Sequence, residues 1–172
     1  MNPKLKIKEM DINKWANKYD YSENEKELIK LIPKIRKKGY LSKTELKKVA
    51  YWKSPRVSGH IDKNDPAFVK EITKFSLNTK IEQARIEPLT LLSGVSWPVS
   101  SVILHFFHKA KYPILDFRAL WSVGLEVPSQ YTFDFWWEYV QFCRNISKKT
   151  KISMRKLDMA LWQYSKENQK TD

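Results

Sequence analysis

Apolar residues recur every three or four positions along most of the chain, which is the spacing of one face of an α-helix. The clearest example lies at residues 23–38, where the repeat is carried by Leu28, Leu31, Ile32 and Ile35. Pro33 lies inside this run and lacks a backbone N–H, so we expect it to kink or split the helix. Gly39 then ends the helix, because glycine readily adopts the left-handed conformation that closes one.

Signals for helix starts divide the next part of the chain. Ser42 and Glu45 have the spacing of a capping box, which predicts a helix running to about Trp52. Pro55 stops that helix. Asn64-Asp65-Pro66 is typical of an N-cap followed by a first-turn proline, and it predicts a further helix that carries Phe68, Ile72 and Phe75.

Helical spacing continues to the C-terminus. The segment from about Lys80 to Leu92 is expected to turn Ile81, Ala84 and Leu92 inward. A helix ending at Phe107 places Val102, Ile103 and Phe106 toward the core. Two longer helices are predicted at about 132–147 and 153–167. Because no convincing alternating strand is found, the pattern predicts an all-α fold of eight or nine helices.

Composition bounds the size and the partners of this fold. A chain of 172 residues with 42% hydrophobic content can bury one sizeable core, which predicts a single domain over residues 1–172, or a body of two packed lobes. The 32 Lys and Arg residues outnumber the 19 Asp and Glu residues and give a formal charge of +13. Such an excess favours a polyanionic partner, since neutralised phosphates release counterions. The alternative is that many of the lysines only keep the protein in solution.

Cysteine usage and the N-terminus suggest a compartment. Cys143 is the single cysteine, so the chain has neither an internal disulfide nor a cysteine cluster for zinc or an iron–sulfur centre. The first residues are basic but lack the apolar region of a signal peptide, and no stretch has the length of a membrane span. We therefore expect a cytoplasmic, monomeric protein that does not enter a membrane and uses no metal or other cofactor.

A short turn at residues 93–96 precedes the helix that ends at Phe107. Gly94 is one of only four glycines in the chain, and a tight turn between helices requires a residue that tolerates positive φ. The exposed amides of such a turn lie at the N-terminus of the next helix, where they can bind a phosphate. Gly94, Val95, Ser96 and Trp97 are therefore candidate nucleic-acid contacts.

This turn and the segment after it resemble the helix-hairpin-helix DNA glycosylase superfamily. The family hairpin has the pattern Leu-Pro-Gly-Val-Gly, and the matching residues are Leu92-Ser93-Gly94-Val95-Ser96. The family places a catalytic Asp after an apolar stretch, and Tyr112-Pro113-Ile114-Leu115-Asp116 matches that context and separation. The helix that follows, closing on Gly124-Leu125, is also similar. The resemblance places the helix-hairpin-helix region at about residues 80–125.

The resemblance implies a monofunctional DNA N-glycosylase of base excision repair, with Asp116 as its catalytic carboxylate. Pro98 occupies the position of the nucleophilic lysine in lyase-competent relatives, so no lyase activity is expected. Ser96 replaces the second glycine of the hairpin. Arg118 would pair with Asp116 or hold a phosphate. The alternative for Asp116 is that it only caps the next helix.

Aromatic and basic residues complete the predicted interface. Trp52, Tyr112 and Trp121, together with Trp97, are candidates for stacking on a base. Lys53 and Arg56 flank Trp52 and are candidates for phosphate contacts. These residues would equally end a helix, with Trp52 in the core and the two cations offsetting the helix dipole.

Two hypotheses of different classes remain. One is a DNA glycosylase that acts on a damaged or mispaired base in double-stranded DNA. The other is a non-catalytic nucleic-acid-binding or interaction module with the same fold. The sequence names no lesion, because base choice depends on the shape of the pocket, and it leaves RNA open as the polyanion.

Overall fold

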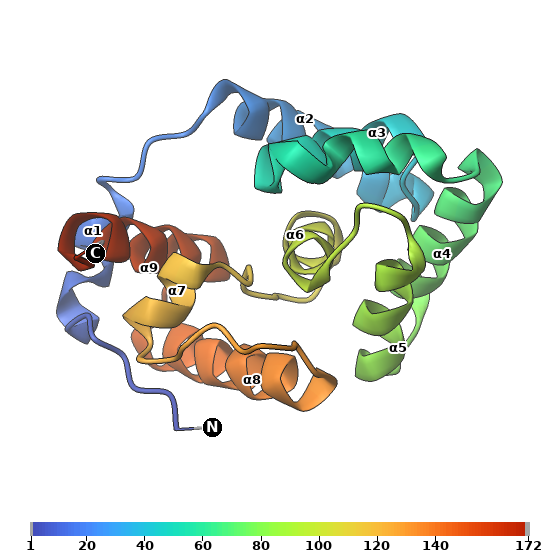
Figure 1. Ribbon diagram of the computed structural model, residues 1–172. Coiled ribbons are helices and arrows are strands. Elements are labelled where there is room, and N and C mark those ends of the chain that lie inside the picture. Colours follow the sequence, from blue (N-terminus) through green and yellow to red (C-terminus); the bar gives the residue numbers. More distant parts are fainter. Residues whose placement is uncertain (1, 171–172) are drawn as a thin grey trace. The chain divides into compact units, whose positions relative to one another are not determined.

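The computed structural model describes residues 2–170, and the regular secondary structure of these residues is helical, with no strand among them. This confirms the all-α prediction. The α-helices are α1 (Ile12–Ala16), α2 (Glu23–Lys38), α3 (Lys43–Lys53), α4 (Pro66–Asn78), α5 (Glu82–Ile86), α6 (Trp97–Phe107), α7 (Phe117–Ser122), α8 (Phe133–Thr150) and α9 (Met154–Asn168) (Figure 1). Short 3-10 helices are η1 (Glu9–Asp11), η2 (Pro55–Lys63) and η3 (Glu87–Leu91). None of the helices within residues 2–170 combines the length and apolar character needed to cross a membrane.

The chain divides into two compact units. Unit 1 consists of Met1–Asp20 and Lys111–Asp172, and unit 2 is the continuous segment Tyr21–Ala110. The predicted helix-hairpin-helix region at about 80–125 therefore falls across the boundary, with its turn in unit 2 and Asp116 in unit 1. The prediction that all 172 residues form one domain stays a prediction.

Unit 2 is built around α6. Figure 1 shows α6 almost end-on, with α2 and α3 on one side of it and α4 and α5 on another. Its residues Val102, Ile103 and Phe106 are buried, as the apolar spacing predicts. α6 is apolar on nearly every face, which is typical of a helix that is enclosed by its neighbours.

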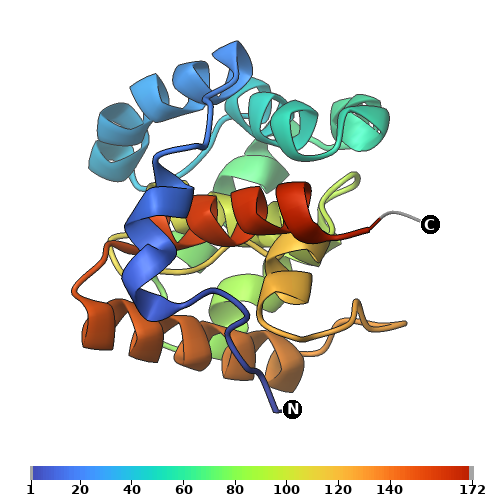
Figure 2. The same cartoon turned by 90° about the vertical axis from the view of Figure 1, so that its left-hand side faces the viewer.

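Unit 1 is built around α9, which packs against α1, α7 and α8. Figure 2 shows α1 lying across α9. Leu157, Ala160 and Leu161 form the buried face of α9. The start of the chain is tied to the end of α7, because Lys4 and Lys6 donate backbone hydrogen bonds of 2.8 and 2.9 Å to the carbonyl oxygens of Val123 and Ser122.

The structure of unit 2 differs from three of the predictions made from the sequence. Pro33 lies inside α2 without splitting it, since it faces solvent and removes only one backbone hydrogen bond. Ile81 is 65% exposed rather than turned inward, because α5 begins only at Glu82. α4 leaves Phe68 and Phe75 exposed, and the face that it buries is smaller and more polar: Val69, Thr73 and Ser76.

Glu45 joins the end of α2 to the start of α3. It completes the predicted capping box, in which the Glu45 N–H donates to the Ser42 hydroxyl and the Ser42 N–H donates to Oε2 of Glu45 at 2.8 Å. Lys38 Nζ also donates to Oε2, and Lys34 Nζ lies 3.3 Å from Oε1. Burial alone would raise the pKa of Glu45, but hydrogen bonds from Lys38 and Ser42 outweigh it and hold the pKa below its ordinary value.

We expect Glu45→Gln, which keeps the shape and removes the charge, to lower the free energy of unfolding by about 1–2 kcal/mol at pH 7. Because the folded-state pKa is lowered, ionised Glu45 stabilises the fold fully above the unfolded-state pKa of 4.5 and loses this effect as the pH falls through the folded-state value. Urea unfolding at pH 7 and pH 4 should therefore show a difference between variant and wild type that narrows in acid.

The matched control is Glu27→Gln, which breaks an exposed ion pair with Lys30 on α2. Exposed pairs contribute little to stability, so this variant should unfold almost as the wild type does. A Glu45 effect that is equal at both pH values would contradict the assignment.

Candidate nucleic-acid interface

The turn before α6 requires glycine at position 94. Gly94 has φ of +81°, a conformation that L side chains rarely adopt. A Cβ at this position would lie 2.9 Å from the carbonyl oxygen of Val57 and 3.1 Å from the Cβ of His60. The turn is therefore packed directly onto η2, and the sequence-based prediction of positive φ at Gly94 is confirmed.

Asn64 holds this turn in place by hydrogen bonds to Ser93, a role that was not predicted. Its Nδ2 donates to the carbonyl oxygen of Ser93 at 2.9 Å, and its Oδ1 accepts from the Ser93 N–H at 2.8 Å. Nδ2 also donates to the carbonyl oxygen of Ile61 at 3.0 Å. Asn64 is only 7% exposed, so these bonds form in a nearly dry environment. The motif Asn64-Asp65-Pro66 gave no signal for this, because only Asp65 acts as the N-cap of α4.

The turn presents a mixed surface. The Val95 side chain is buried and its N–H donates to the carbonyl oxygen of Leu92 at 3.0 Å, so Val95 serves the fold. Ser96 is exposed and extended as the N-cap of α6, with no side-chain capping bond, and Trp97 is half-buried. Pro98 lies in the first turn of α6, as expected. Of the four nucleic-acid contacts predicted in this turn, Ser96 and Trp97 are the two whose side chains reach solvent.

Gly94→Ala should destabilise the protein by about 2–4 kcal/mol, because a Cβ would strain the backbone and press on η2. Gly59→Ala is the matched control in the same unit, since nothing lies within 4 Å of a Cβ there. Thermal or urea unfolding of both variants measures the difference. Equal losses in the two variants would show that the turn tolerates a side chain.

The predicted Trp52–Arg56 group lies at the end of α3 and the start of η2 in unit 2. Trp52 is half-buried and meets the ring of Phe106 edge-on, with ring centroids 5.6 Å apart. Lys53 is half-buried, whereas Arg56 is exposed. Trp52 therefore packs against α6, and Arg56 is the member of the group that reaches solvent.

The segment that carries Asp116 is pinned from both sides within unit 1. Asp158 Oδ1 accepts from the Ile114 N–H at 3.2 Å, and the Tyr139 hydroxyl donates to the Ile114 carbonyl oxygen at 3.2 Å. Arg144 Nε donates to the Lys111 carbonyl oxygen at 2.9 Å. These bonds hold a segment without regular secondary structure, which leads directly to Asp116 at the start of α7.

Asp116 is the N-cap of α7. Its Oδ1 accepts from the Arg118 N–H at 2.9 Å, and the residue is half-buried. The Arg118 guanidinium instead lies over the rings of Phe117 and Trp162, at 5.0 and 5.6 Å. Burial, and then the charge of Asp116, raise the pKa of Tyr131. The capping role expected as the alternative is thus present, and the catalytic role stays a prediction.

The rings of the predicted stacking residues of unit 1, Tyr112 and Trp121, already contact other side chains of the protein. Tyr112 is fully buried, stacked on Trp136 at 5.6 Å, with the guanidinium of Arg144 at 4.7 Å from its ring centroid. Its ring is therefore part of the core and offers no face to a base. Trp121 is half-buried, and Lys6 Nζ lies 3.5 Å from the centroid of its ring.

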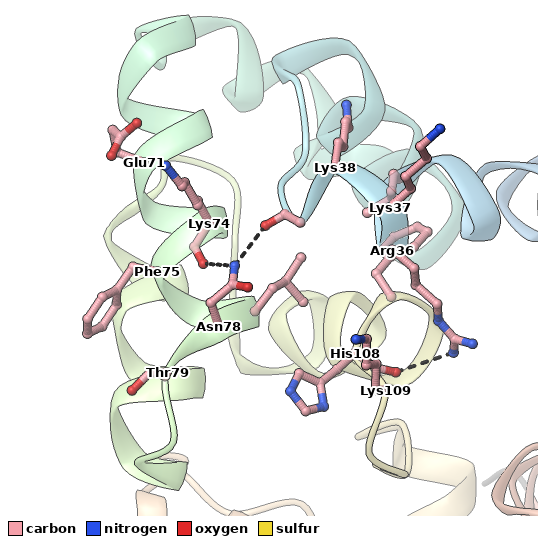
Figure 3. A pocket seen from close by; sticks show the side chains of 14 residues that line it. Arg36, Lys37, Lys38, Glu71, Lys74, Phe75, Asn78, Thr79, His108 and Lys109 are labelled. Carbon is pink, nitrogen blue, oxygen red and sulfur yellow. Dashed lines mark hydrogen bonds between the residues drawn. The ribbon is translucent and has the colours of Figure 1, made fainter.

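A basic cavity in unit 2 was not predicted. It has a volume of about 860 Å³ and is lined by the C-terminal ends of three helices, α2, α4 and α6 (Figure 3). Five of its lining residues are basic: Arg36, Lys37, Lys38, Lys74 and Lys109. Glu71 is the one acidic lining residue. In sequence these cations are scattered over more than 70 positions, and only the convergence of the three helix ends brings them together.

Two polar side chains organise this cavity. Arg36 donates to the carbonyl oxygens of Phe106 and His108 at 3.1 and 3.3 Å, which satisfies the end of α6. Asn78 Nδ2 donates to the carbonyl oxygens of Gly39 and Lys74 at 3.1 and 2.6 Å, which links the ends of α2 and α4 (Figure 3). The cavity therefore has a hydrogen-bonded frame.

The remaining cations differ in how far they are neutralised. Lys38 is bound to Glu45. Within residues 2–170, Lys37, Lys74 and Lys109 make no ion pair with any carboxylate. Three ammonium groups around one cavity are therefore available to an external anion.

Among residues 2–170, no group of three or more His, Cys, Asp or Glu residues is arranged to hold a metal ion. Cys143 is buried in α8, and burial raises the pKa of its thiol, so the reactive thiolate does not form at neutral pH.

Compared with known proteins, the chain matches no family model and shows no significant similarity to a curated protein or a solved structure. The resemblance to helix-hairpin-helix DNA glycosylases therefore depends on residues 92–125 alone. In the structure the 3-10 helix η3 precedes the turn at Gly94, α6 follows the turn, and Asp116 caps α7.

Proposed function

We propose that the protein binds double-stranded DNA mainly through its phosphates. The observation that carries the proposal is the set of three lysines that line one cavity of unit 2 and form no ion pair among residues 2–170: Lys37, Lys74 and Lys109. Cations that are not neutralised by the protein gain most from phosphate, because each contact releases condensed counterions. Unit 2 as a whole carries nearly twice as many basic as acidic residues.

The turn before α6 supports the same proposal. Gly94 allows the backbone to turn tightly, and exposed Ser96 begins an eleven-residue helix. Backbone amides at such a helix start favour an anion. Because Asn64 holds the turn in place, the amides would be preorganised, and little conformational entropy would be lost on binding.

A monofunctional DNA N-glycosylase is the second candidate. It is favoured by Asp116, a half-buried carboxylate that directly follows a segment held by hydrogen bonds from Tyr139 and to Asp158. In this reaction the bond between the base and C1′ breaks, water forms the new bond to C1′, and a proton passes to the base. The Asp116 carboxylate would stabilise the developing positive charge on the sugar and accept the water proton.

Replacing Lys37, Lys74 and Lys109 together by Ala should weaken binding to a blunt DNA duplex at least tenfold at low salt. The slope of log K against log salt should fall in magnitude by about 2–3, since each lost phosphate contact contributes about 0.9. Fluorescence anisotropy at several salt concentrations measures both quantities.

The control removes the same charge from lysines that are already paired. Lys26, Lys30 and Lys47 form ion pairs with Glu23, Glu27 and Asp62 in the same unit. Their triple Ala variant should lose much less affinity. If both triple variants weaken equally, only net charge matters and the cavity is not the contact; if the wild type does not bind duplex at low salt, the proposed function is wrong.

Asp116→Asn tests the second candidate. Asn is as good an N-cap as Asp, so α7 should persist while the charge is lost. In single-turnover assays on duplexes with a panel of damaged or mispaired bases, the wild type should release a base and the variant should be slower by a factor of about 100 or more. Circular dichroism checks that the variant is folded.

Two results would decide against the enzyme. Equal release by both proteins would remove Asp116 from the reaction. Failure of the wild type to release any base in the panel would leave the non-catalytic binding protein as the function. Duplex binding is expected of both candidates, so it tests only what they share.

A further inference from the structure

Two basic side chains of unit 1 lie over one aromatic ring. The ring belongs to Trp162 on α9, which is half-buried. The Arg118 guanidinium lies 5.6 Å from the ring centroid, and Lys166 Nζ lies 5.2 Å from it. The ring of Tyr19 meets the same indole edge-on, with centroids 5.4 Å apart, and so supports its position. The ring and both cations therefore meet at one place in unit 1.

A second ring lies on the other side of Arg118. The guanidinium is 5.0 Å from the ring centroid of Phe117, a residue that is 50% exposed. The ring centroids of Phe117 and Trp162 can therefore lie no farther apart than the sum of their two distances to Arg118. The charges of Arg118 and Lys166 are limited in the same way, because both contact Trp162. We call Phe117, Arg118, Trp162 and Lys166 the Trp162 cluster, and its members lie within reach of one short strand.

The cations of this cluster are not neutralised by the protein. Within residues 2–170, neither Arg118 nor Lys166 forms an ion pair. The carboxylates of Asp158 and Glu167 on the same helix are each held in an ion pair by another cation. Oδ1 of Asp116 accepts a hydrogen bond from the backbone N–H of Arg118 rather than from its guanidinium. Both positive charges are therefore available to an external anion.

The geometry points to the Trp162 cluster as a binding site for single-stranded nucleic acid. Unpaired bases stack on the rings of Phe117 and Trp162, and the two cations bind phosphates of the same strand. Bases in a duplex stack on one another and offer no free face, so the cluster selects an unpaired strand. The inference goes beyond the proposed duplex binding, because it concerns unit 1 and a different form of nucleic acid.

Binding requires an exchange at the Trp162 ring, since Arg118 and Lys166 lie over it. A cation–π contact at an exposed site contributes less than the stacking of a base on an aromatic ring. Both side chains are long and flexible, so a cation that leaves the ring still reaches a phosphate next to the incoming base. The strand thus replaces one weak contact by a stacked base and a charge-assisted hydrogen bond.

A membrane surface is the other partner that tryptophan and basic residues suit. Binding at such a surface needs apolar side chains that enter the lipid. In the Trp162 cluster the indole is half-buried and Tyr19 lies against its edge, so Phe117 is the one exposed ring available for insertion. Nucleic acid is therefore favoured over lipid.

The first test measures binding of a fluorescein-labelled oligothymidylate to the full chain by fluorescence anisotropy. Trp162→Leu should weaken binding at least tenfold, whereas Trp162→Phe keeps a ring and should retain most of the affinity. Phe117→Ala should weaken binding severalfold without disturbing the core, because Phe117 is exposed. All three variants should bind a blunt duplex as the wild type does, and thermal unfolding checks that each is folded.

The second test removes the two charges. Arg118→Gln combined with Lys166→Gln should weaken binding of oligothymidylate at least tenfold at low salt. The matched control combines Lys148→Gln with Lys156→Gln, because these lysines are exposed in the same unit, form no ion pair within residues 2–170 and lie outside the cluster. The control should lose less than threefold. Equal losses in the two double variants would mean that net charge alone attracts the strand, and would overturn the inference.

Further probes separate the possible ligands. Thymidine monophosphate contacts one ring at most, so it should bind at least tenfold more weakly than oligothymidylate; equal binding would contradict a strand that spans both rings. Trp162-dependent binding to phosphatidylserine vesicles, without binding to oligothymidylate, would identify lipid instead and overturn the inference.

Duplex and single-strand binding can fail separately. If Trp162→Leu and Phe117→Ala bind oligothymidylate as the wild type does while the duplex is still bound, the Trp162 cluster is wrong and the proposed function stands. If the wild type binds oligothymidylate in a Trp162-dependent manner but binds no duplex, the proposed function is wrong and the cluster stands.

Discussion

Three helices of unit 2 end at one place, and this convergence determines the character of the site. The last turn of every helix leaves carbonyl oxygens without partners inside the helix. Here Arg36 satisfies the end of α6, and Asn78 satisfies carbonyl oxygens of α4 and Gly39. Basic residues are therefore required first by the fold. The fold uses only some of these cations, since Lys37, Lys74 and Lys109 form no ion pair within the described part of the chain.

A second constraint acts at the other end of α6. Gly94 has no room for a side chain against η2. The side-chain amide of Asn64 donates a hydrogen bond to the carbonyl oxygen of Ser93 and accepts one from its N–H. The two contacts come from the same short stretch, η2 and the residue after it. The entry of α6 is thus set by η2, just as its exit is set by Arg36 of α2.

Local chemistry explains which features were predictable from sequence. The capping box at Ser42 and Glu45 and the positive φ of Gly94 depend on residues that are close in the chain, and both are confirmed. Tyr112 is predicted as a candidate for stacking on a base, but it is buried and stacks on Trp136, a partner more than 20 positions away in the chain. The basic cavity was not predictable for the same reason, since its cations come from segments that are far apart in the sequence. Asp116 shows a different limit: a cap and a catalytic carboxylate call for the same residue in the same place.

The length of α6 sets the distance between the turn at Gly94 and the basic cavity. An eleven-residue helix is about 16 Å long, so the turn at Gly94 and the basic cavity lie at opposite ends of a buried rod of about that length. Its start favours anions through backbone amides, whereas its end favours them only through side chains, because the dipole there has the opposite sign. If one DNA strand contacted both ends of α6, about five nucleotides would lie between the two contacts, at a rise of roughly 3.4 Å per nucleotide. Binding at the start of α6 would depend on the backbone geometry of the turn, and binding at its end would depend on side-chain charge, so the two proposed contacts would differ in physical origin.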